Sequence, residues 1–302
     1  MPCYYPLRAF QSKTRADGKV SIAFSPTRAC FIRLELPCGR CIGCRLERSR
    51  QWAVRIMHEA QLHDLNCFIT LTYSSENLPV TGSLRKGHFQ LFMKRLRKAI
   101  SPKKVRFYAC GEYGDQLSRP HYHAILFGVS FSDLQFHTET AAGKLYSSQT
   151  LEDLWGLGFC TVGSVTFDSA AYVARYCTKK INGPIAKNHY ERVDQTTGEV
   201  VRLQPEFSLM SRRPGIASDW IEKFQSDVYP SDQVISKGFP AKPPRYYDKI
   251  LEVKNPEQLT SIKEIRRDRA HARDADNSTA RLRVRETVAK AKLNLKRRVL
   301  DQ

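Results

Sequence analysis

The chain has 302 residues, of which 41% are hydrophobic and 10% aromatic. This length and composition exclude a wholly disordered protein and allow one large domain or two small ones. With 49 Lys and Arg against 30 Asp and Glu, the formal charge is +19. Such a chain is attracted to polyanions. Nucleic acid is the commonest of these because neutralising its phosphates releases counterions, while ribosomes and acidic lipids are alternatives.

The N-terminal segment lacks the basic and apolar regions of a secretory signal, and no apolar run approaches the roughly 18 residues of a membrane span. We therefore expect an intracellular protein without a membrane segment. The nine cysteines are an odd number. In a chain without an export signal they are better explained as reduced thiols or metal ligands than as a disulfide framework.

Two amphipathic helices and one strand are predicted in the first third of the chain. The spacing of apolar residues and the β-branched runs place them at residues 45–63 (helix), 67–73 (strand) and 88–100 (helix). The second helix has a strongly basic outer face. On the first helix, a phosphate-contacting row and a solvated face are equally good interpretations of three arginines, Arg45, Arg48 and Arg55.

The middle of the chain continues as a mixture of strands and helices. Residues 104–111 and 121–129 are expected to pair as an antiparallel hairpin across a Gly-, Asp- and Pro-containing turn. A short helix, a strand and a longer helix should follow at residues 151–155, 159–165 and 169–180. These elements predict an α+β fold with a central antiparallel sheet of about five strands flanked by helices.

The signal weakens after residue 182, where we expect a hairpin turn at 194–199, a helix at 216–224 and a linker at 239–247. From Lys263 to Arg298, 13 basic residues stand against 5 acidic ones, which suits a DNA-binding arm or a solvated helix. The chain is thus expected to have four parts. They are a Cys-rich segment (1–45), a core (46–182), an accessory region (183–238) and a basic linker with a helical tail (239–302).

His121 and His123 are two residues apart on a predicted strand, so their side chains leave the same face of the sheet. The hairpin would bring Glu112 beside them, although Asp115 and Gln116 in the turn compete as carboxylate or amide ligands. Two imidazoles and a carboxylate suit magnesium or manganese in a nuclease, but also ferrous iron or zinc. Paired histidines without a metal are the simpler alternative.

Tyr172 and Tyr176 are four residues apart on a predicted helix, and Lys179 follows on the same face. Half-buried packing is the common role of tyrosines at this spacing. Beside a metal site, however, a phenol gains what it needs to attack a phosphodiester, because the ion polarises the phosphate. Lys179 would lower the pKa of a phenol or hold the scissile phosphate.

Three motifs in this order resemble those of HUH endonucleases. They are Phe68-Ile-Thr-Leu-Thr-Tyr73, Arg119-Pro-His-Tyr-His-Ala-Ile-Leu-Phe127 and Tyr172-Val-Ala-Arg-Tyr-Cys-Thr-Lys-Lys180. With Cys38-Gly-Arg-Cys-Ile-Gly-Cys44 and Arg50-Gln-Trp-Ala-Val-Arg55, the chain is similar to rolling-circle replication initiators of gokushovirus-like Microviridae phages over about residues 1–225. The resemblance implies the HUH fold, which has an RRM- or ferredoxin-like topology.

The resemblance further implies an endonuclease and strand transferase in the cytoplasm of a bacterial host. One tyrosine would attack the origin strand, form a 5′-phosphotyrosine bond and free a 3′-hydroxyl for the host polymerase. The second would cut the regenerated origin, and the displaced strand would be rejoined without ATP. Carried over, the nucleophiles are Tyr172 and Tyr176, Lys179 supports them, and His121, His123 and Glu112 hold magnesium or manganese.

The cysteines indicate a second metal site. Cys38, Cys41 and Cys44, joined by Cys3 or by its rival Cys30, would supply the four thiolates of a structural zinc. An iron–sulfur cluster or reduced thiols are the alternatives. The remaining cysteines are expected in the core.

Gly82 and Gly87 have the spacing of the two glycines in the phosphate-binding loop of an ATPase. They are followed by His88 and Phe89 instead of Lys and Ser or Thr, so this loop is absent. Strand separation would therefore rely on supercoiled origin DNA and a host helicase, and no small-molecule substrate is expected. Two other functions remain open at this point. One is a non-catalytic basic DNA-binding protein, and the other is an HUH nuclease of the plasmid, relaxase or transposase type.

Overall fold

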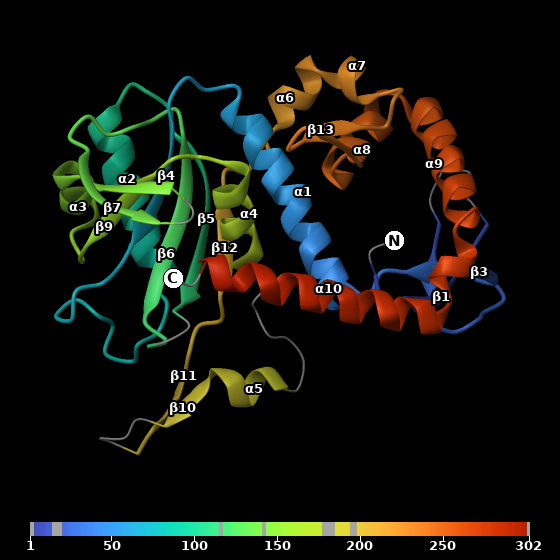
Figure 1. Cartoon of the computed structure of the whole chain (residues 1–302), viewed down its shortest axis with the longest axis horizontal. Coiled ribbons are helices and arrows are strands. Elements are labelled where there is room, and N and C mark those ends of the chain that lie inside the picture. The colour runs from blue at the N-terminus through green and yellow to red at the C-terminus, as the bar shows by residue number, and fades with distance from the viewer. Residues whose placement is uncertain are drawn as a thin grey trace. The chain divides into compact units, whose positions relative to one another are not determined.

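The computed structural model describes residues 3–13, 20–114, 117–140, 143–176, 185–193 and 198–300 (Figure 1). Its contacts divide the chain into two compact units. Unit 1 contains residues 1–47 and 260–301, and unit 2 contains residues 48–259. The four-part division expected from the sequence stays a prediction.

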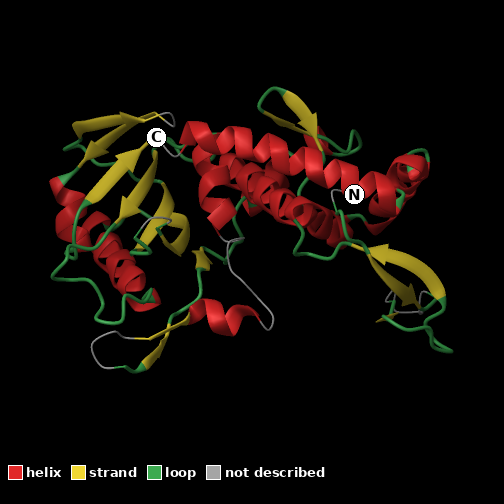
Figure 2. Ribbon diagram, turned by 60° about the horizontal axis from the view of Figure 1, so that its bottom comes forward, coloured by secondary structure: helices red, strands yellow, loops and turns green. Residues whose placement is uncertain are grey.

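Unit 2 is built around one antiparallel sheet of seven strands. Their order across the sheet is β12 (Phe207–Met210), β5 (Arg106–Tyr113), β6 (Pro120–Phe127), β4 (Asn66–Leu71), β9 (Cys160–Gly163), β8 (Gly143–Ser147) and β7 (Gln135–Thr140). Figure 2 draws the strands of both units as yellow arrows. The predicted α+β class with a central antiparallel sheet is confirmed.

The sheet has seven strands, whereas the sequence indicated about five. Strand β7 escaped prediction because nearly all of its residues are exposed, so it lacks the alternation of apolar and polar residues that marks a half-buried strand. Strand β12 comes from the region after residue 182, where the sequence signal is weak. It pairs with β5 at the opposite edge, so the accessory region contributes directly to the central sheet.

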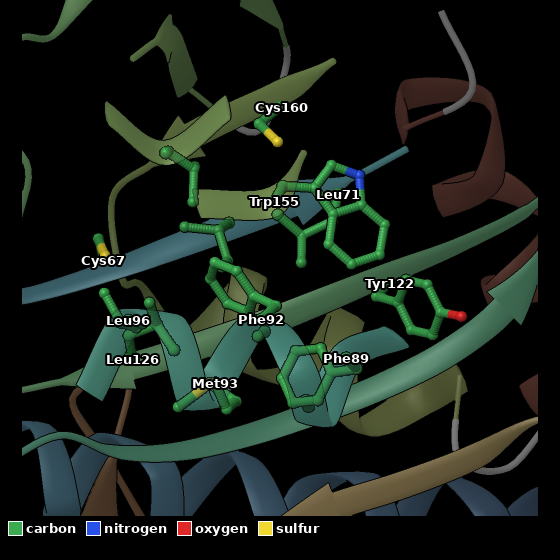
Figure 3. Close-up of a cluster of buried hydrophobic side chains, with 14 of the residues drawn as sticks. Cys67, Leu71, Phe89, Phe92, Met93, Leu96, Tyr122, Leu126, Trp155 and Cys160 are labelled. Carbon is green, nitrogen blue, oxygen red and sulfur yellow. The ribbon is translucent and has the colours of Figure 1, made fainter. Parts of the chain in front are cut away.

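Helices α2 (Lys86–Ile100) and α3 (Gln149–Trp155) supply the apolar side chains that cover one face of the sheet. The basic outer face predicted for α2 leaves its apolar stripe for this contact. Figure 3 shows the resulting core. It includes Cys67, Leu71, Phe89, Phe92, Leu96, Tyr122, Trp155 and Cys160, all of them buried.

Helices α1 (Ile42–Ala60) and α4 (Phe167–Tyr176) pack on the other face. Small residues on both helices, Ala53 and Ala170, are fully buried between them and the sheet. The Ser49 hydroxyl donates a hydrogen bond of 3.0 Å to the carbonyl of Ala171. Near the end of α1, the buried Glu59 carboxylate accepts hydrogen bonds from the Arg106 guanidinium and from a backbone N–H. These contacts fix α4 against α1 and α1 against the sheet.

The remaining elements of unit 2 follow α4. They are α5 (Ile185–Tyr190), the hairpin of β10 (Glu191–Val193) with β11 (Val200–Arg202), α6 (Ser218–Lys223), α7 (Gln225–Val228), the hairpin of β13 (Val234–Ser236) with β14 (Phe239–Ala241), and α8 (Arg245–Lys254). A hairpin was expected around residues 194–199, and β10 and β11 flank that stretch; residues 194–197 lie outside the described part.

The linker expected at residues 239–247 is wrong. This stretch contains β14 and the start of α8. Its prolines and basic residues suggested an exposed connection, yet Tyr247 is fully buried and packs with Trp220 of α6 and His58 of α1. Burial of the Tyr247 ring therefore favours a packed helix over the exposed turn that the prolines indicated.

Arg55 is not part of a phosphate-contacting row. Its guanidinium lies over the rings of Trp52 and Tyr246, at 4.2 and 3.7 Å from their centroids, and donates two hydrogen bonds to the carbonyl of Ile216. Burial lowers the pKa of Arg55 to about 10. The side chain thus joins α1 to α8 and to the loop before α6.

Unit 1 combines the N-terminal residues with the C-terminal helices. Strands β1 (Leu7–Gln11), β2 (Ile22–Ala23) and β3 (Ile32–Leu36) form a sheet in the order β2-β1-β3. Helix α9 (Pro256–His271), a short 3₁₀ turn (Asp274–Asn277) and α10 (Thr279–Leu300) follow at the other end of the chain. Among the described residues, no helix has the length and apolar character needed to span a membrane.

We expect Phe92→Ala to lower the free energy of unfolding by about 3–5 kcal/mol, because it leaves a cavity in the closed core. Leu91→Ala on the same helix is the control. Leu91 is 51% exposed whereas Phe92 is fully buried, so the control should change stability by less than about 0.5 kcal/mol. Urea denaturation measures both values, and equal losses would contradict the assignment of this face of α2 to the core.

His58 makes the stability of unit 2 depend on pH. Burial lowers its pKa to about 4, from 6.5 in the unfolded chain. Between pH 4 and pH 6.5 the unfolded chain therefore binds a proton on His58 that the folded state excludes. The contribution of neutral His58 to the free energy of unfolding is complete above pH 6.5 and is lost as the pH falls towards 4. At pH 5 the loss should amount to about 2 kcal/mol.

Urea denaturation of the wild type and of His58→Gln at pH 7.5 and pH 5 checks this expectation. Glutamine retains a polar group beside the Tyr247 hydroxyl, which lies 2.7 Å from His58 Nδ1, but it does not titrate. The variant should lose less stability on acidification than the wild type. Identical losses would show that His58 does not govern the pH response.

Candidate metal centre and tyrosine helix

The hairpin of β5 and β6 brings Glu112, His121 and His123 together. In its register Glu112 lies opposite His121, and Cys110 lies opposite His123. Because alternate residues of a strand share a face, the three side chains meet on the face that carries α1 and α4. The Glu112 Oε1 atom lies 2.9 Å from the Nε2 atoms of both histidines. We call these residues the Glu-His-His cluster.

Each histidine uses its other ring nitrogen to contact the surrounding fold. His121 Nδ1 lies 3.1 Å from the carbonyl oxygen of Arg119, and His123 Nδ1 lies 2.9 Å from the hydroxyl of Thr70 on β4. A carbonyl only accepts hydrogen bonds, so it holds the proton of His121 on Nδ1. In the neutral ring, Nε2 then presents a lone pair to the cluster, as a metal ligand does.

This donor set fits a cation. A lone pair on His121 Nε2 and the carboxylate oxygen of Glu112 are both acceptors, so a proton or a metal ion is needed between them. Burial raises the pKa of Glu112, but its hydrogen bonds to His121 and His123 outweigh burial and lower that pKa below its usual value. Glu112 is therefore an anion. All three ligand atoms lie within 4.8 Å of one another, which suits one divalent ion of unspecified identity.

Asp115 and Gln116, the turn residues considered as alternatives to Glu112, lie outside the described residues. Tyr122, between the two histidines, points to the opposite face as alternation requires. It is fully buried, and its hydroxyl donates to the carbonyl of Arg85 at 2.8 Å. Glu112 is the carboxylate that the described residues bring to the histidines.

Helix α4 carries Tyr172 to the same face. The Thr166 hydroxyl accepts a hydrogen bond from the Ser169 N–H at the start of this helix, as a capping residue does. The Tyr172 ring meets the His123 ring edge-on, with centroids 5.1 Å apart and planes at 81°. Phe68 of β4 stacks on the His123 ring at 5.7 Å and meets the Tyr172 ring edge-on at 6.5 Å. A half-buried phenol therefore lies in direct contact with a metal-ligand candidate.

Tyr176 is the last residue of α4, one helical turn beyond Tyr172. Its side chain and all of Lys179 lie outside the described residues. Tyr172, Tyr176 and Lys179 were expected on one face of this helix. The structure describes the side-chain surroundings of Tyr172 alone. The helix predicted at 169–180 is observed from residue 167 to 176.

Sequence reasoning missed the two side chains that position His123. Thr70 and Phe68 belong to the Phe68–Tyr73 motif, in which every second residue shares the face of the cluster. Period-two alternation places these residues on one face. The register of β4 against β6, which places Thr70 opposite His123 and Phe68 opposite Ile125, is a long-range property that local patterns do not contain.

The cysteines of the other motif also meet, in unit 1. The sulfur atoms of Cys3, Cys38, Cys41 and Cys44 all lie within 4.8 Å of one another; we call them the cysteine cluster. Cys30, considered as a rival fourth ligand, lies apart, with its Sγ 3.5 Å from the carbonyl of Ser21. Cys67, Cys110 and Cys160 are buried in the core of unit 2, and Cys177 lies outside the described residues.

We expect Thr70→Val to weaken binding of manganese about tenfold, because loss of the hydroxyl frees the His123 ring to rotate away from the cluster. Thr161→Val is the matched control, since Thr161 pairs with Thr70 from the neighbouring strand β9 but is separated from His123 by β4. Isothermal titration calorimetry measures both affinities. A tenfold loss in the control as well would point to general damage of the sheet.

Known proteins are similar to this chain over the region that contains the candidate site. The family model described as replication-associated protein ORF2/G2P matches residues 66–181, which include β4, both histidines and Tyr172. The chain is 33% identical over 268 residues to replication-associated protein VP4 of Bdellovibrio phage phiMH2K, covering 85% of this chain and 79% of that protein. No solved structure matches it.

Two further relatives carry similar names. Replication-associated protein ORF2 of Spiroplasma virus 4 is 33% identical over 273 residues, covering 83% of this chain and 81% of that protein. Replication-associated protein ORF4 of Chlamydia phage 1 is 30% identical over 228 residues, covering 72% of this chain and 53% of that protein. The extent of these matches, with the Glu-His-His cluster and the tyrosine helix inside the matched region, shows that the chain belongs to the family of phage replication-associated proteins.

Proposed function

We propose that this protein initiates rolling-circle replication of a phage genome by nicking the origin strand, with Tyr172 as a nucleophile. The observation that carries the proposal is the edge-on contact of the Tyr172 ring with His123 of the Glu-His-His cluster, at 5.1 Å between centroids. A phenol beside a candidate metal ligand is the pairing that phosphodiester attack by tyrosine requires.

The chemistry is an exchange of one phosphodiester for another. The Tyr172 oxygen bonds to the scissile phosphorus, the bond from phosphorus to the 3′ oxygen breaks, and the DNA end with the 5′ phosphate stays on the protein. The phenol loses its proton, and the departing 3′ oxygen gains one. Since the number of phosphodiester bonds is unchanged, the reverse attack by a 3′-hydroxyl rejoins a strand without ATP.

Glu112, His121 and His123 would hold the metal ion, for which we propose magnesium or manganese. A bound divalent ion supplies a Lewis acid that polarises the phosphate and stabilises the charge on its oxygens. The protein's part is to hold the ligands. The Arg119 carbonyl and the Thr70 hydroxyl orient the imidazoles, and α1 holds α4 through the bond from Ser49 to the carbonyl that precedes Tyr172.

Tyr176 is proposed as the second nucleophile, which cuts the origin regenerated after one round. It follows Tyr172 by four residues, and residues at this spacing share one side of a helix. Lys179 would support either phenol by favouring its ionised form or by holding the phosphate. Two phenols on one side of the helix would let one tyrosine remain bound to DNA while the other attacks.

The proposed substrate is the viral origin, as single-stranded or supercoiled DNA. The net charge of +19 favours binding to phosphates. Helix α2 adds an exposed basic face, formed by Lys86, Lys94, Arg95, Arg97 and Lys98. We further propose that a host polymerase extends the 3′-hydroxyl and that a host helicase separates the strands.

The decisive test is a covalent adduct. Single-stranded origin DNA is incubated with the protein and manganese or magnesium, and a conjugate that resists denaturation is sought on a gel. The wild type should form it. Tyr172→Phe and Tyr176→Phe should each retain the adduct if the tyrosines are interchangeable, and the double variant should lose it by about a thousandfold or more, because no nucleophile remains.

Tyr146→Phe, which changes a partly buried tyrosine on β8, is the control and should behave as the wild type. A conjugate in the double variant would refute the assignment of the nucleophiles. Absence of any conjugate with every metal would instead favour a non-catalytic DNA-binding protein.

A further inference from the structure

The cysteine cluster is a motif that the proposed nicking reaction does not use. Its four residues come from three places in unit 1. Cys3 precedes β1, Cys38 follows β3, Cys41 lies in the turn before α1, and Cys44 lies in the first turn of that helix. The antiparallel register of β1 and β3 pairs Leu7 with Leu36. This pairing brings Cys3 and Cys38 together although 35 residues separate them in the sequence.

The geometry suits four thiolates around one point. The Sγ atoms of Cys3 and Cys41 lie 4.0 Å apart, and all four sulfurs lie within 4.8 Å of one another. A disulfide requires about 2.05 Å between sulfurs, so no disulfide joins these four cysteines. Around a tetrahedral zinc ion with Zn–S bonds of about 2.3 Å, sulfurs are about 3.8 Å apart. A [4Fe–4S] cluster would bind each thiolate to a different iron, and a [2Fe–2S] cluster would divide the four thiolates between two irons, so both need wider spacing.

Backbone N–H groups point at these sulfurs. Tyr4 donates to Cys41 Sγ at 3.4 Å, and the N–H of Cys38 donates to Cys3 Sγ at 3.3 Å. The N–H groups of Cys41 and Cys44 donate to Cys38 Sγ and Cys41 Sγ at 3.3 and 3.5 Å. Sulfur accepts such bonds best as a thiolate, the form in which it binds a metal. Gly39, with a φ of +75°, allows the tight turn between Cys38 and Cys41.

The residues next to Cys3 contact the C-terminal helix α10. The carbonyl of Tyr4 accepts a hydrogen bond of 2.9 Å from the Arg283 guanidinium, which also lies 3.6 Å from the centroid of the Tyr5 ring. The Tyr5 hydroxyl donates to the Glu286 carboxylate at 2.7 Å. Glu286 is buried, so this face of α10 depends on the contact with Tyr5. Tyr4 thus donates to the cluster through its N–H and accepts from α10 through its carbonyl.

We infer that Cys3, Cys38, Cys41 and Cys44 bind one structural zinc ion and that this ion couples the N-terminal segment to α10 through Tyr4 and Tyr5. Zinc releases the thiol protons and closes the loop from Cys3 to Cys44. The positions of Tyr4 and Tyr5 are then fixed, and α10 gains its docking site. Without the ion the sulfurs regain their protons, nothing links the four side chains, and the segment that holds α10 loosens. The inference is independent of the nicking reaction.

Metal content is the first test. The protein is purified as His121→Gln, His123→Gln, so that the Glu-His-His cluster does not contribute, and its metals are measured by mass spectrometry. We expect about one zinc per chain. Replacement by cobalt should give the intense near-ultraviolet absorption of thiolate-to-cobalt charge transfer. Stoichiometric iron, or less than about a tenth of an equivalent of zinc that added zinc does not restore, would overturn the site.

Cys41→Ser and Cys30→Ser form the matched pair of variants. Both change one cysteine in unit 1, but Cys30 lies outside the cluster. The first should lose the cobalt absorption and bind zinc at least about tenfold more weakly in competition with a chelator, while the second should bind it as the parent does. Equal binding by the two variants would contradict the proposed ligands.

Hydrogen exchange tests the coupling to α10. Peptides from residues 279–295 should exchange at least about tenfold faster after a chelator removes zinc, because the docked helix opens. Peptides from α2, in unit 2, are the internal control and should not change. Unchanged exchange in α10 of a protein that has demonstrably lost its zinc would refute the coupling. A failure of DNA nicking would affect none of these readouts.

Discussion

The antiparallel register of β5 and β6 is the constraint on which the candidate site depends. Glu112 lies opposite His121, and His123 lies one pleat further along the same face. A slip by one residue would turn the histidines towards α2 and bury them in the apolar core. Tyr122 opposes such a slip, because its ring fills that core and its hydroxyl bonds to the backbone of Arg85. The side chain between the two ligands therefore secures both.

The two faces of the sheet have different tasks. The face under α2 and α3 is closed by large apolar side chains, which gives the strands a rigid base. The other face carries polar groups at the end of the β5–β6 hairpin, where α1 and α4 pack with small residues such as Ala53 and Ala170. Small side chains allow the helices to approach closely, so α4 carries Tyr172 to His123. Such a frame limits the entropy that the candidate site would lose on binding a ligand.

In unit 1 the two ends of the chain pack together, through contacts of Tyr4 and Tyr5 with α10. Its three-stranded sheet is small, and several of its apolar residues, including Phe24 and Phe31, are exposed. A module with so little buried surface gains stability from a metal or from added packing. The cysteine cluster and the contacts of Tyr4 and Tyr5 with α10 are suited to provide these two sources. The basic tail is thus a docked helix along at least one of its turns.

Alternation and helical periodicity are local properties, so the amino-acid sequence alone predicted the class of fold, the faces of the strands and the residue types of the candidate site. His121, His123 and Tyr172 were found in this way, and so were the three clustered cysteines of residues 38–44. Tertiary structure decided what local patterns do not contain. It placed Thr70 on His123 and Arg55 between aromatic rings, buried Tyr247 in a stretch that resembled a linker, and chose Cys3 over Cys30. Each of these outcomes depends on strand register or helix packing between residues far apart in the chain, and those are settled only when the whole core closes.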